Sequence, residues 1–432
     1  MIMVSIILNR FLILFLLQYL PNYHSWLCLF IKKRFLFIYS LLILKFTFQK
    51  KFFSFNKLNI LLIPLSFYLL ILISLVNINN KLKTNLKQKC FILVTLFSIL
   101  AFSTSDFLLF LIFFEASIIP LFILIIVRGK KKKRLLAGSY LIGYTFLRSV
   151  PLIITLIYLK YQIKSWYICL IKIRDKKNLF FFVSLAFLIK LPVYGFHTWL
   201  PKAHVEAPLP GSMLLAAISL KVGGYGLYFF NSLKKGKPGL IFYCFLGVLI
   251  SSFICFRQTD LKVFIALTSV VHMSLVATSL IIKTQFSILG ASLLMISHGL
   301  TSSCMFFLAK TIYIRTSSRK LIILKSIIKL VSFFSLWWLI LILFDLGFPP
   351  TLKFFREIFM FLTILKYKII YFFFIPFFFI TVIFYFIKIF TKLIKFTIKK
   401  NKNFFKSIFK LEHLSVLYHI IPLFFLITLR KW

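Results

Sequence analysis

Acidic residues are almost absent from this chain, which has 8 Asp and Glu against 54 Lys and Arg in 432 residues. The formal net charge is therefore +46 at pH 7. A nucleic-acid-binding protein would gather such charge on one basic face, but these lysines stand between apolar runs, as juxtamembrane anchors do. The pattern argues against a nucleic-acid partner. It predicts contact with anionic membrane lipids, with cardiolipin among them.

Cysteine and glycine are also scarce, with 6 and 14 copies. No two cysteines form a C-x-x-C pair, which argues against a zinc site and against an iron–sulfur cluster. The chain has no glycine-rich dinucleotide loop and no helix with two histidines at the spacing of a haem pair. We therefore expect no cofactor and no metal ion in this chain.

What the chain has in abundance is hydrophobic sequence, 61% of all residues. Apolar runs recur from end to end, so we predict one all-α polytopic membrane domain of about fourteen transmembrane helices. No polar gap is long enough for a soluble domain. The predicted spans are 3–20, 35–47, 58–78, 89–103, 106–127, 135–158, 179–198, 211–231, 239–256, 263–283, 286–309, 323–365, 367–388 and 411–430.

Two of these spans are interrupted by proline, at Lys190-Leu-Pro192 and at Gly347-Phe-Pro349-Pro350. Proline removes a backbone donor and clashes with the preceding turn, so both helices are predicted to be discontinuous. In lipid, such breaks occur where protein or water lines them, and paired broken helices are typical of inverted-repeat transporters. The alternative is a simple packing kink. A charge near each break favours a functional role.

The composition indicates the kind of genome that encodes this chain. Phe (58 copies), Ile, Leu and Lys dominate, while Gly is scarce. This composition is typical of an AT-rich genome. The amino-terminal apolar run lacks the Arg- and Ser-rich character of a transit peptide. We therefore expect an organelle-encoded, multi-pass protein of the mitochondrial inner membrane, with a bacterial plasma membrane as the alternative.

Four charges stand deep within predicted spans: Glu115, Lys190, Lys221 and Glu357. A charge at mid-bilayer costs about 2.5–3.5 kcal/mol on insertion scales, so it is usually retained for function. Burial and a nearby opposite charge act in opposite directions on proton affinity, which suits a proton-transfer site. The structural alternatives are a satisfied ion pair for Glu115, snorkelling of Lys190 to the interface, and neutralisation of Glu357 by Lys353 at i−4.

Histidines supply further candidates, since histidine titrates near neutrality and can pass protons. His272 and His298 fall within predicted spans, where a hydrogen-bonded core histidine is the alternative reading. His197, His204 and Glu206 resemble a metal trio but border a proline-rich connection. We favour hydrogen bonding at helix ends for these three.

Several motifs occur in the order and spacing of one family. They are Phe113-Phe-Glu-Ala-Ser117, the stretch 190–226, Gln258-Thr-Asp-Leu-Lys262 with His272-Met273, Ser297-His-Gly-Leu300 and Tyr313-Ile-Arg-Thr316. Over roughly residues 90–365 the chain resembles the antiporter-like subunits of respiratory complex I, and subunit 4 of NADH:ubiquinone oxidoreductase in particular.

The resemblance implies fourteen helices with two inverted five-helix repeats. The corresponding divisions are 1–88 for helices 1 to 3, 89–231 for the first repeat, 232–390 for the second repeat and 391–432 for the last helix. It also implies proton-transfer roles. Glu115 and Lys190 match the family's coupled ion pair, Lys221 its central relay, and Glu357 its exit-side site. His272 and His298 match histidines along the polar axis.

The function implied by the resemblance is proton translocation in the membrane arm of complex I. NADH, FMN, iron–sulfur clusters and ubiquinone would then be bound by other subunits, and neighbouring membrane-arm subunits would be the protein partners. One departure stands out: Arg148 occupies a position where the family usually has Gly. This extra charge needs a partner, and it motivates the alternative of a structural subunit with a decayed channel. A stand-alone cation/proton antiporter subunit is a further alternative.

Overall fold

The computed structural model describes most of the chain from residue 57 onward. The described ranges are 57–77, 85–127, 132–163, 177–231, 238–316, 318–321, 332–349, 351–394 and 410–428. Nine helices in these ranges are long and apolar enough to cross a membrane, and two shorter apolar helices accompany them. The predicted spans 3–20 and 35–47 lie outside the described residues.

The first half of the bundle begins with α3 (Lys57–Asn77) and α4 (Asn85–Ser103). A third span is made by α5 (Phe107–Ala116) and α6 (Ile118–Ile126), joined at Ser117, and the long α7 (Lys132–Ile163) follows. All are helices because lipid offers no hydrogen-bond partners, so every backbone group must be satisfied within its own segment.

The next two spans are irregular. Helix α8 (Lys177–Lys190) ends at the predicted break, and α9 (Trp199–Glu206) resumes after a loop. The following span joins α10 (Leu209–Leu214) to α11 (Leu220–Asn231) through the π-helical turn η3 (Leu215–Ser219). Single π-turns within α-helices are rare and are frequent at functional sites.

The second half begins with α12 (Pro238–Arg257), α13 (Leu261–Ile282) and α14 (Gln285–Thr316). The second broken span follows, with α16 (Ser332–Leu346) and α17 (Leu352–Tyr367) on either side of the break. The remaining elements are the 3₁₀ turn η4 (Ile369–Phe373), α18 (Phe374–Ile394) and α19 (Lys410–Thr428).

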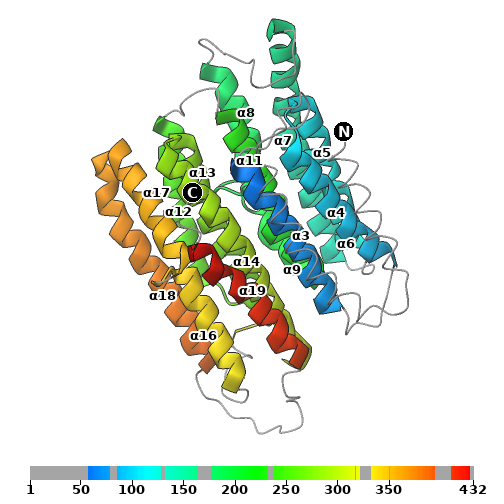
Figure 1. Cartoon of the computed structure of the whole chain (residues 1–432), viewed down its shortest axis with the longest axis vertical. Coiled ribbons are helices and arrows are strands. Elements are labelled where there is room, and N and C mark those ends of the chain that lie inside the picture. Colours follow the sequence, from blue (N-terminus) through cyan, green and yellow to red (C-terminus); the bar gives the residue numbers. More distant parts are fainter. Residues whose placement is uncertain are drawn as a thin grey trace.

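Figure 1 shows the helices running side by side along the long axis, with α3 and α19 crossing in front of α11 and α14. Helix α13 lies at the centre of the bundle, because all residues of its apolar membrane-spanning stretch are buried. In the corresponding stretch of α7, 28% of the residues are buried. Helix α18 is equally peripheral, at 28%. The charged and histidine positions predicted on α11, α13 and α14 therefore lie inside the bundle.

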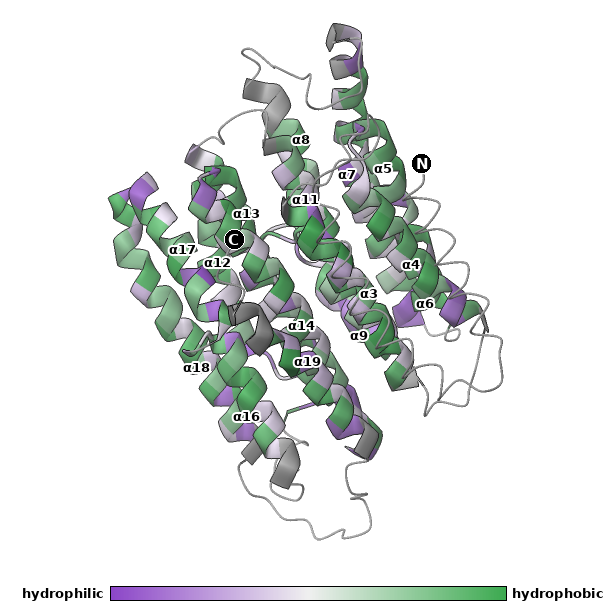
Figure 2. Cartoon of the chain, viewed as in Figure 1, coloured by the Kyte–Doolittle hydropathy of each residue, from purple (hydrophilic) through white to green (hydrophobic). Residues whose placement is uncertain are grey.

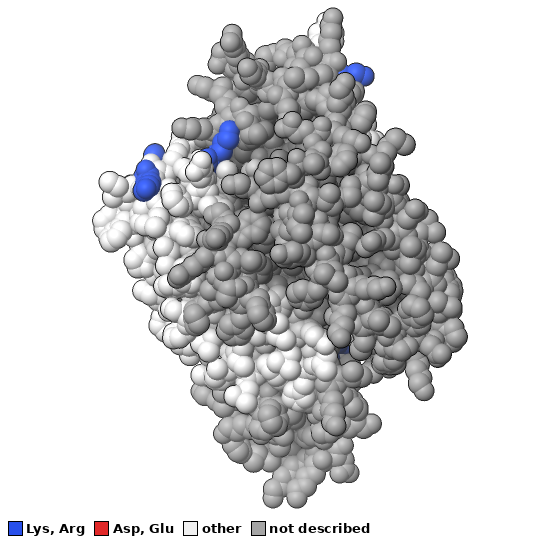
Figure 3. Space-filling view, viewed as in Figure 1, with Lys and Arg blue, Asp and Glu red and all other residues white. Residues whose placement is uncertain are grey.

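The distribution of hydrophobic residues over the helices is the one expected in a lipid environment. Figure 2 shows hydrophobic residues along most of each helix, with hydrophilic residues mainly at helix ends and at isolated places within the bundle. On the face in Figure 3, the visible described residues are mostly uncharged, with Lys and Arg near the edges and no acidic residue in view. Large apolar side chains such as Phe146, Ile154 and Phe384 are exposed on the outer helices.

Phenylalanine fills the interior of the first half. Phe110 contacts Phe114, Phe187, Tyr225 and Phe229, with ring centroids 5.4–6.2 Å apart. These contacts join α5, α8 and α11. Tilted and edge-on ring pairs at such distances stabilise packing beyond simple area burial.

Both predicted breaks are confirmed. The chain leaves helical geometry after Lys190 and again after Leu346, and each break contains a glycine with positive φ, Gly195 at 93° and Gly347 at 76°. Within each predicted five-helix set, the broken helix is the fourth. The prediction of an all-α polytopic fold with two discontinuous helices is confirmed, while the division at 88, 231 and 390 stays a prediction.

Candidate functional site: a buried line of charged and histidine side chains

The first cluster lies where α5, α7 and α8 meet. Arg148 on α7 donates from Nη2 to both carboxylate oxygens of Glu115, at 3.0 and 3.1 Å. The Arg148 side chain is 4% exposed and the Glu115 side chain 28%. The extra cation that sequence comparison singled out thus has a partner, and it is the acid of the predicted proton-transfer pair.

Lys190, at the end of α8, lies beside this pair. Its ammonium is 3.5 Å from the carbonyl oxygen of Phe114 and 3.5 Å from the centre of the Phe114 ring. Among the described residues we find no acidic group within 4.0 Å of Lys190 Nζ, so the predicted direct pair with Glu115 is not formed in this state. Lys190 is 3% exposed, which argues against snorkelling to the interface.

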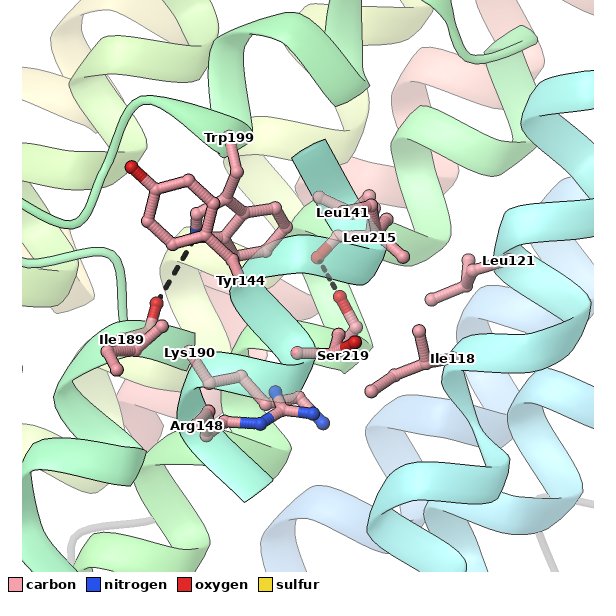
Figure 4. Close-up of a pocket in the computed structure, with 11 residues that line it drawn as sticks. Ile118, Leu121, Leu141, Tyr144, Arg148, Ile189, Lys190, Trp199, Leu215 and Ser219 are labelled. Atoms are coloured by element: carbon pink, nitrogen blue, oxygen red, sulfur yellow. Dashed lines mark hydrogen bonds between the residues drawn. The ribbon is translucent and has the colours of Figure 1, made fainter. Parts of the chain in front are cut away.

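A small cavity of about 30 Å³ connects this cluster to the next span. Arg148 and Lys190 line it from one side, and Tyr144, Thr145 and Ser219 line it as well. Figure 4 shows the Arg148 and Lys190 side chains close together, with Ser219 on the neighbouring element. Mostly apolar side chains surround the cavity, which lies between Lys190 and the π-turn.

Lys221 stands two residues beyond Ser219, directly after the π-turn, and is fully buried. Its ammonium donates to the carbonyl oxygen of Ala216 at 2.5 Å and lies 3.1 Å from Nδ1 of His298. The glycine on the facing helix allows close packing here. A Cβ added to Gly299 of α14 would lie 3.6 Å from Lys221 Cε. Lys221 is thus held at a helix–helix contact.

His298 and His272 continue the line into the second half. Their rings lie 5.5 Å apart, centroid to centroid, and both residues are 1% exposed. On its far side, His272 Nε2 is 2.8 Å from Nζ of Lys353 on α17. Two central helices and the second broken span therefore meet at these histidines.

Lys353 is the centre of the last cluster. Its ammonium lies 3.3 Å from Oδ1 of Asp345 and 3.8 Å from Oε1 of Glu357. It also donates to the Asp345 carbonyl oxygen. Asp345 in turn lies 3.6 Å from His272 Nε2 and accepts a hydrogen bond from Thr301 Oγ1 at 3.3 Å.

The second break shapes this cluster. Asp345 lies just before it and Lys353 just after it, so both charges sit at helix ends that the break brings together. Glu357 is 5% exposed, and it lines a larger cavity of about 450 Å³ with Gly347, Pro349 and residues of α18. The line of side chains therefore ends beside an open space on the α17–α18 side.

All six predicted proton-transfer residues belong to this series. In the order of the series they are Glu115, Lys190, Lys221, His298, His272 and Glu357, and their assigned roles stay a prediction. Sequence reasoning did not include Asp345 and treated Lys353 only as a neutralising neighbour of Glu357. A signal was available, because both are charges within an apolar span that flank a proline break.

The predicted hydrogen bonding at helix ends is wrong for the two histidines of the trio His197, His204 and Glu206, because His197 Nδ1 and both ring nitrogens of His204 are buried without a hydrogen-bond partner among the described residues. His197 stacks on Tyr194, His204 stacks on Phe306 with ring centroids 4.6 Å apart, and Glu206 pairs with Arg134 at 3.7 Å. Within the part of the chain that the structure describes, no group of three potential metal ligands occurs.

Comparison with known proteins agrees with this geometry. Residues 104–384 match the family model described as NADH:quinone oxidoreductase/Mrp antiporter, TM. The chain is 38% identical over 375 residues to NADH-ubiquinone oxidoreductase chain 4 of Paracentrotus lividus, covering 82% of this chain and 81% of that protein. It is 42% identical over 315 residues to chain 4 of Struthio camelus, covering 69% of each.

Two solved structures share the fold. One is respiratory complex I from Thermus thermophilus with bound NADH, with a TM-score of 0.73, 22% identity, and coverage of 86% of this chain and 80% of that chain. The other is an archaeal membrane-bound sulfane sulfur reductase, with a TM-score of 0.74, 16% identity, and coverage of 86% and 78%. The chain belongs to the NADH:quinone oxidoreductase/Mrp antiporter membrane family, and within it to the NADH-ubiquinone oxidoreductase chain 4 group.

Proposed function

We propose that this chain is a proton-translocating subunit in the membrane arm of respiratory complex I. As such it is part of an H⁺-translocating NADH:ubiquinone reductase and itself carries no redox centre. NADH, FMN, iron–sulfur clusters and ubiquinone are bound by other subunits. The membership in the chain 4 group supports this assignment.

The observation that carries the proposal is the series of buried side chains from one broken helix to the other. Lys190 adjoins the cavity beside the π-turn, Lys221 contacts His298, and His272 contacts Lys353. Groups of this kind in a membrane interior mark proton relays. A proton that leaves Lys190 would pass through the cavity to Lys221, along the two histidines to Lys353, and finally to Glu357.

The structural alternative, a decayed channel, is less consistent with these contacts. That alternative was raised because Arg148 adds a charge to the membrane interior. The structure pairs Arg148 with Glu115, so this charge has a counter-charge. Lys221 and the histidines that follow it are also in contact. A stand-alone antiporter would share the same fold, so the names of the relatives favour complex I where the fold by itself does not.

Partners and location follow from the same proposal. The chain sits in the mitochondrial inner membrane beside other membrane-arm subunits, including neighbouring antiporter-like ones. The exposed apolar side chains on α7 and α18 suit contact with lipid or with such subunits. Cardiolipin suits a cavity of about 270 Å³ that is lined by Arg134, Lys262, Lys310 and Arg319, because these cations can bind anionic headgroups.

The test is Lys221→Met in the assembled complex. Methionine keeps the apolar stem but cannot carry a proton, so NADH oxidation should continue while fewer protons are translocated per NADH. Lys388→Met is the matched control, because Lys388 lies on the exposed face of α18 and donates to Phe256 O. We expect a normal proton yield for the control. A normal yield in assembled Lys221→Met complex would refute the proposal.

Co-purification distinguishes a complex I subunit from a stand-alone cation/proton antiporter subunit. A complex I subunit should co-purify with large redox subunits after mild detergent extraction. Isolation with small membrane partners alone would instead favour a stand-alone antiporter.

A further inference from the structure

Glu115 has two cations beside it, and both share one aromatic ring. The Arg148 guanidinium binds both carboxylate oxygens, and its Cζ lies 4.3 Å from the Phe114 ring centre. The Lys190 ammonium lies 3.5 Å from the same ring centre. Phe114, the residue directly before Glu115, therefore contacts two cations, and one of them, Arg148, also binds the Glu115 carboxylate.

The two cations differ chemically. An arginine guanidinium stays protonated in proteins and offers a planar set of donors to a carboxylate, whereas a buried lysine can release its proton. While Arg148 holds Glu115, the carboxylate charge is already compensated. Lys190 is then the cation of the two that can give up a proton, and it adjoins the cavity that leads toward Ser219.

We propose that Arg148 is a positioning residue that competes with Lys190 for Glu115. In the state seen here, Arg148 holds the carboxylate away from Lys190. In a second state, Glu115 turns from Arg148 to Lys190 and retains the lysine proton. Exchange of the Glu115 partner would thus control when Lys190 releases its proton toward Lys221. This inference rests on the proposed proton-translocating function.

The packing allows such an exchange. The Glu115 side chain is 28% exposed, so it is not enclosed as tightly as Arg148, at 4%. The two cations come from different helices, Arg148 from α7 and Lys190 from α8. Both contact Phe114, the residue directly before Glu115. A side-chain rotation of Glu115 is the movement that the proposed exchange requires.

The test compares Arg148→Gln, Arg148→Lys and Lys190→Ala in the assembled complex. With Arg148→Gln, Glu115 should pair with Lys190 in all states, so the proton yield per NADH should fall to the level of Lys190→Ala. Arg148→Lys keeps a cation at this position but lacks the permanently charged, planar guanidinium, so it should restore only part of the yield. A structural role alone would lower the amount of assembled complex without changing the yield of what assembles.

Arg315→Gln is the matched control, because it removes another buried Arg–Glu pair, with Glu412 at 2.6 Å, away from the series. We expect a loss of assembled complex in this control and an unchanged proton yield. An unchanged yield in Arg148→Gln would overturn the inference, as would a yield equally low in Arg148→Gln and Arg148→Lys.

A double variant keeps the test decisive if Arg148→Gln does not assemble. Glu115→Gln/Arg148→Gln removes both charges and leaves neither one buried alone. If Arg148 acts only through Glu115, the double variant should have the same yield as Glu115→Gln. A further loss would contradict the inference. Normal yields in Lys190→Ala and Lys221→Met would instead show that the proposed function itself fails.

Discussion

At the scale of single residues, several of the buried charges in the described residues occur in ion pairs, while Lys190 and Lys221 contact carbonyl, aromatic or histidine groups instead. Arg148 is paired with Glu115, Arg315 with Glu412, and Lys353 with Asp345 and Glu357. Removal of a charge from water is costly, and a buried ion is tolerated only when partners and hydrogen bonds offset that cost. With only 8 acidic residues in 432, the chain places at least four of them in these pairs.

Lys353→Met should destabilise the subunit, because it leaves Asp345 and Glu357 buried without their shared cation. Breaking a buried pair from one side costs about 3–5 kcal/mol. We therefore expect less assembled complex and faster thermal inactivation of NADH oxidation. The double variant Asp345→Asn/Lys353→Met removes one of the two stranded carboxylates and should recover part of the loss. A double variant no more stable than the single one would contradict this account.

At the scale of elements, the two broken helices determine where charges can meet. A continuous helix would satisfy its own backbone, but each break leaves backbone groups that need partners. At the second break, the Asp345 carbonyl accepts from Lys353. At the first, the carbonyl oxygen of Ile189 accepts from the Trp199 indole at 3.2 Å. Both breaks therefore place polar side chains inside the bundle.

Gly347→Ala should disturb the second break. Gly347 has φ 76°, and an added Cβ would lie 3.1 Å from Glu357 Oε2. Left-handed backbone costs a residue with a Cβ about 1–2 kcal/mol, and the contact would push the carboxylate away from Lys353. We expect lower thermal stability of the complex together with a lower proton yield.

The control for this variant is Gly143→Ala in α7, where an added Cβ meets nothing within 4 Å. Alanine is a better helix former than glycine by about 1 kcal/mol, so this change should be neutral or stabilising. Equal effects of the two substitutions would show that the geometry of the break is not the cause.

At the scale of the whole molecule, a chain with a net charge of +46 forms, over its described residues, a bundle of mostly apolar helices. The outer helices expose large apolar side chains, while Arg134, Lys262, Lys310 and Arg319 line the cavity beside α13 and α14. We expect hydrocarbon to stabilise the middle of such a bundle and anionic headgroups to stabilise its ends. Lipid composition should therefore affect its stability.

We expect the complex reconstituted in vesicles of phosphatidylcholine with cardiolipin to resist thermal inactivation better than the complex in phosphatidylcholine alone. The difference should shrink in about 1 M salt, where the screening length falls to about 3 Å. Residual NADH:ubiquinone activity after heating is the measurement. The same thermal stability in both membranes would contradict a role for anionic headgroups.

Much of the architecture could be predicted from sequence, because lipid imposes strict conditions. Apolar length specified the spans: 58–78 corresponds to α3 at Lys57–Asn77, and 263–283 to α13 at Leu261–Ile282. Proline and glycine located both breaks. The cost of a charge in hydrocarbon predicted that Lys190 and Lys221 would face inward, and they are 3% and 0% exposed.

Tertiary structure alone decided which side chains meet. Arg148 and Lys190 both contact Phe114, and the packing of α7 against α5 and α8 pairs Glu115 with Arg148. The π-turn before Lys221 and the meeting of His272 with Lys353 have no signature in sequence spacing. Sequence determines that a buried charge must find a partner in the protein. The rotation and contact of helices far apart in the chain determine which partner it finds.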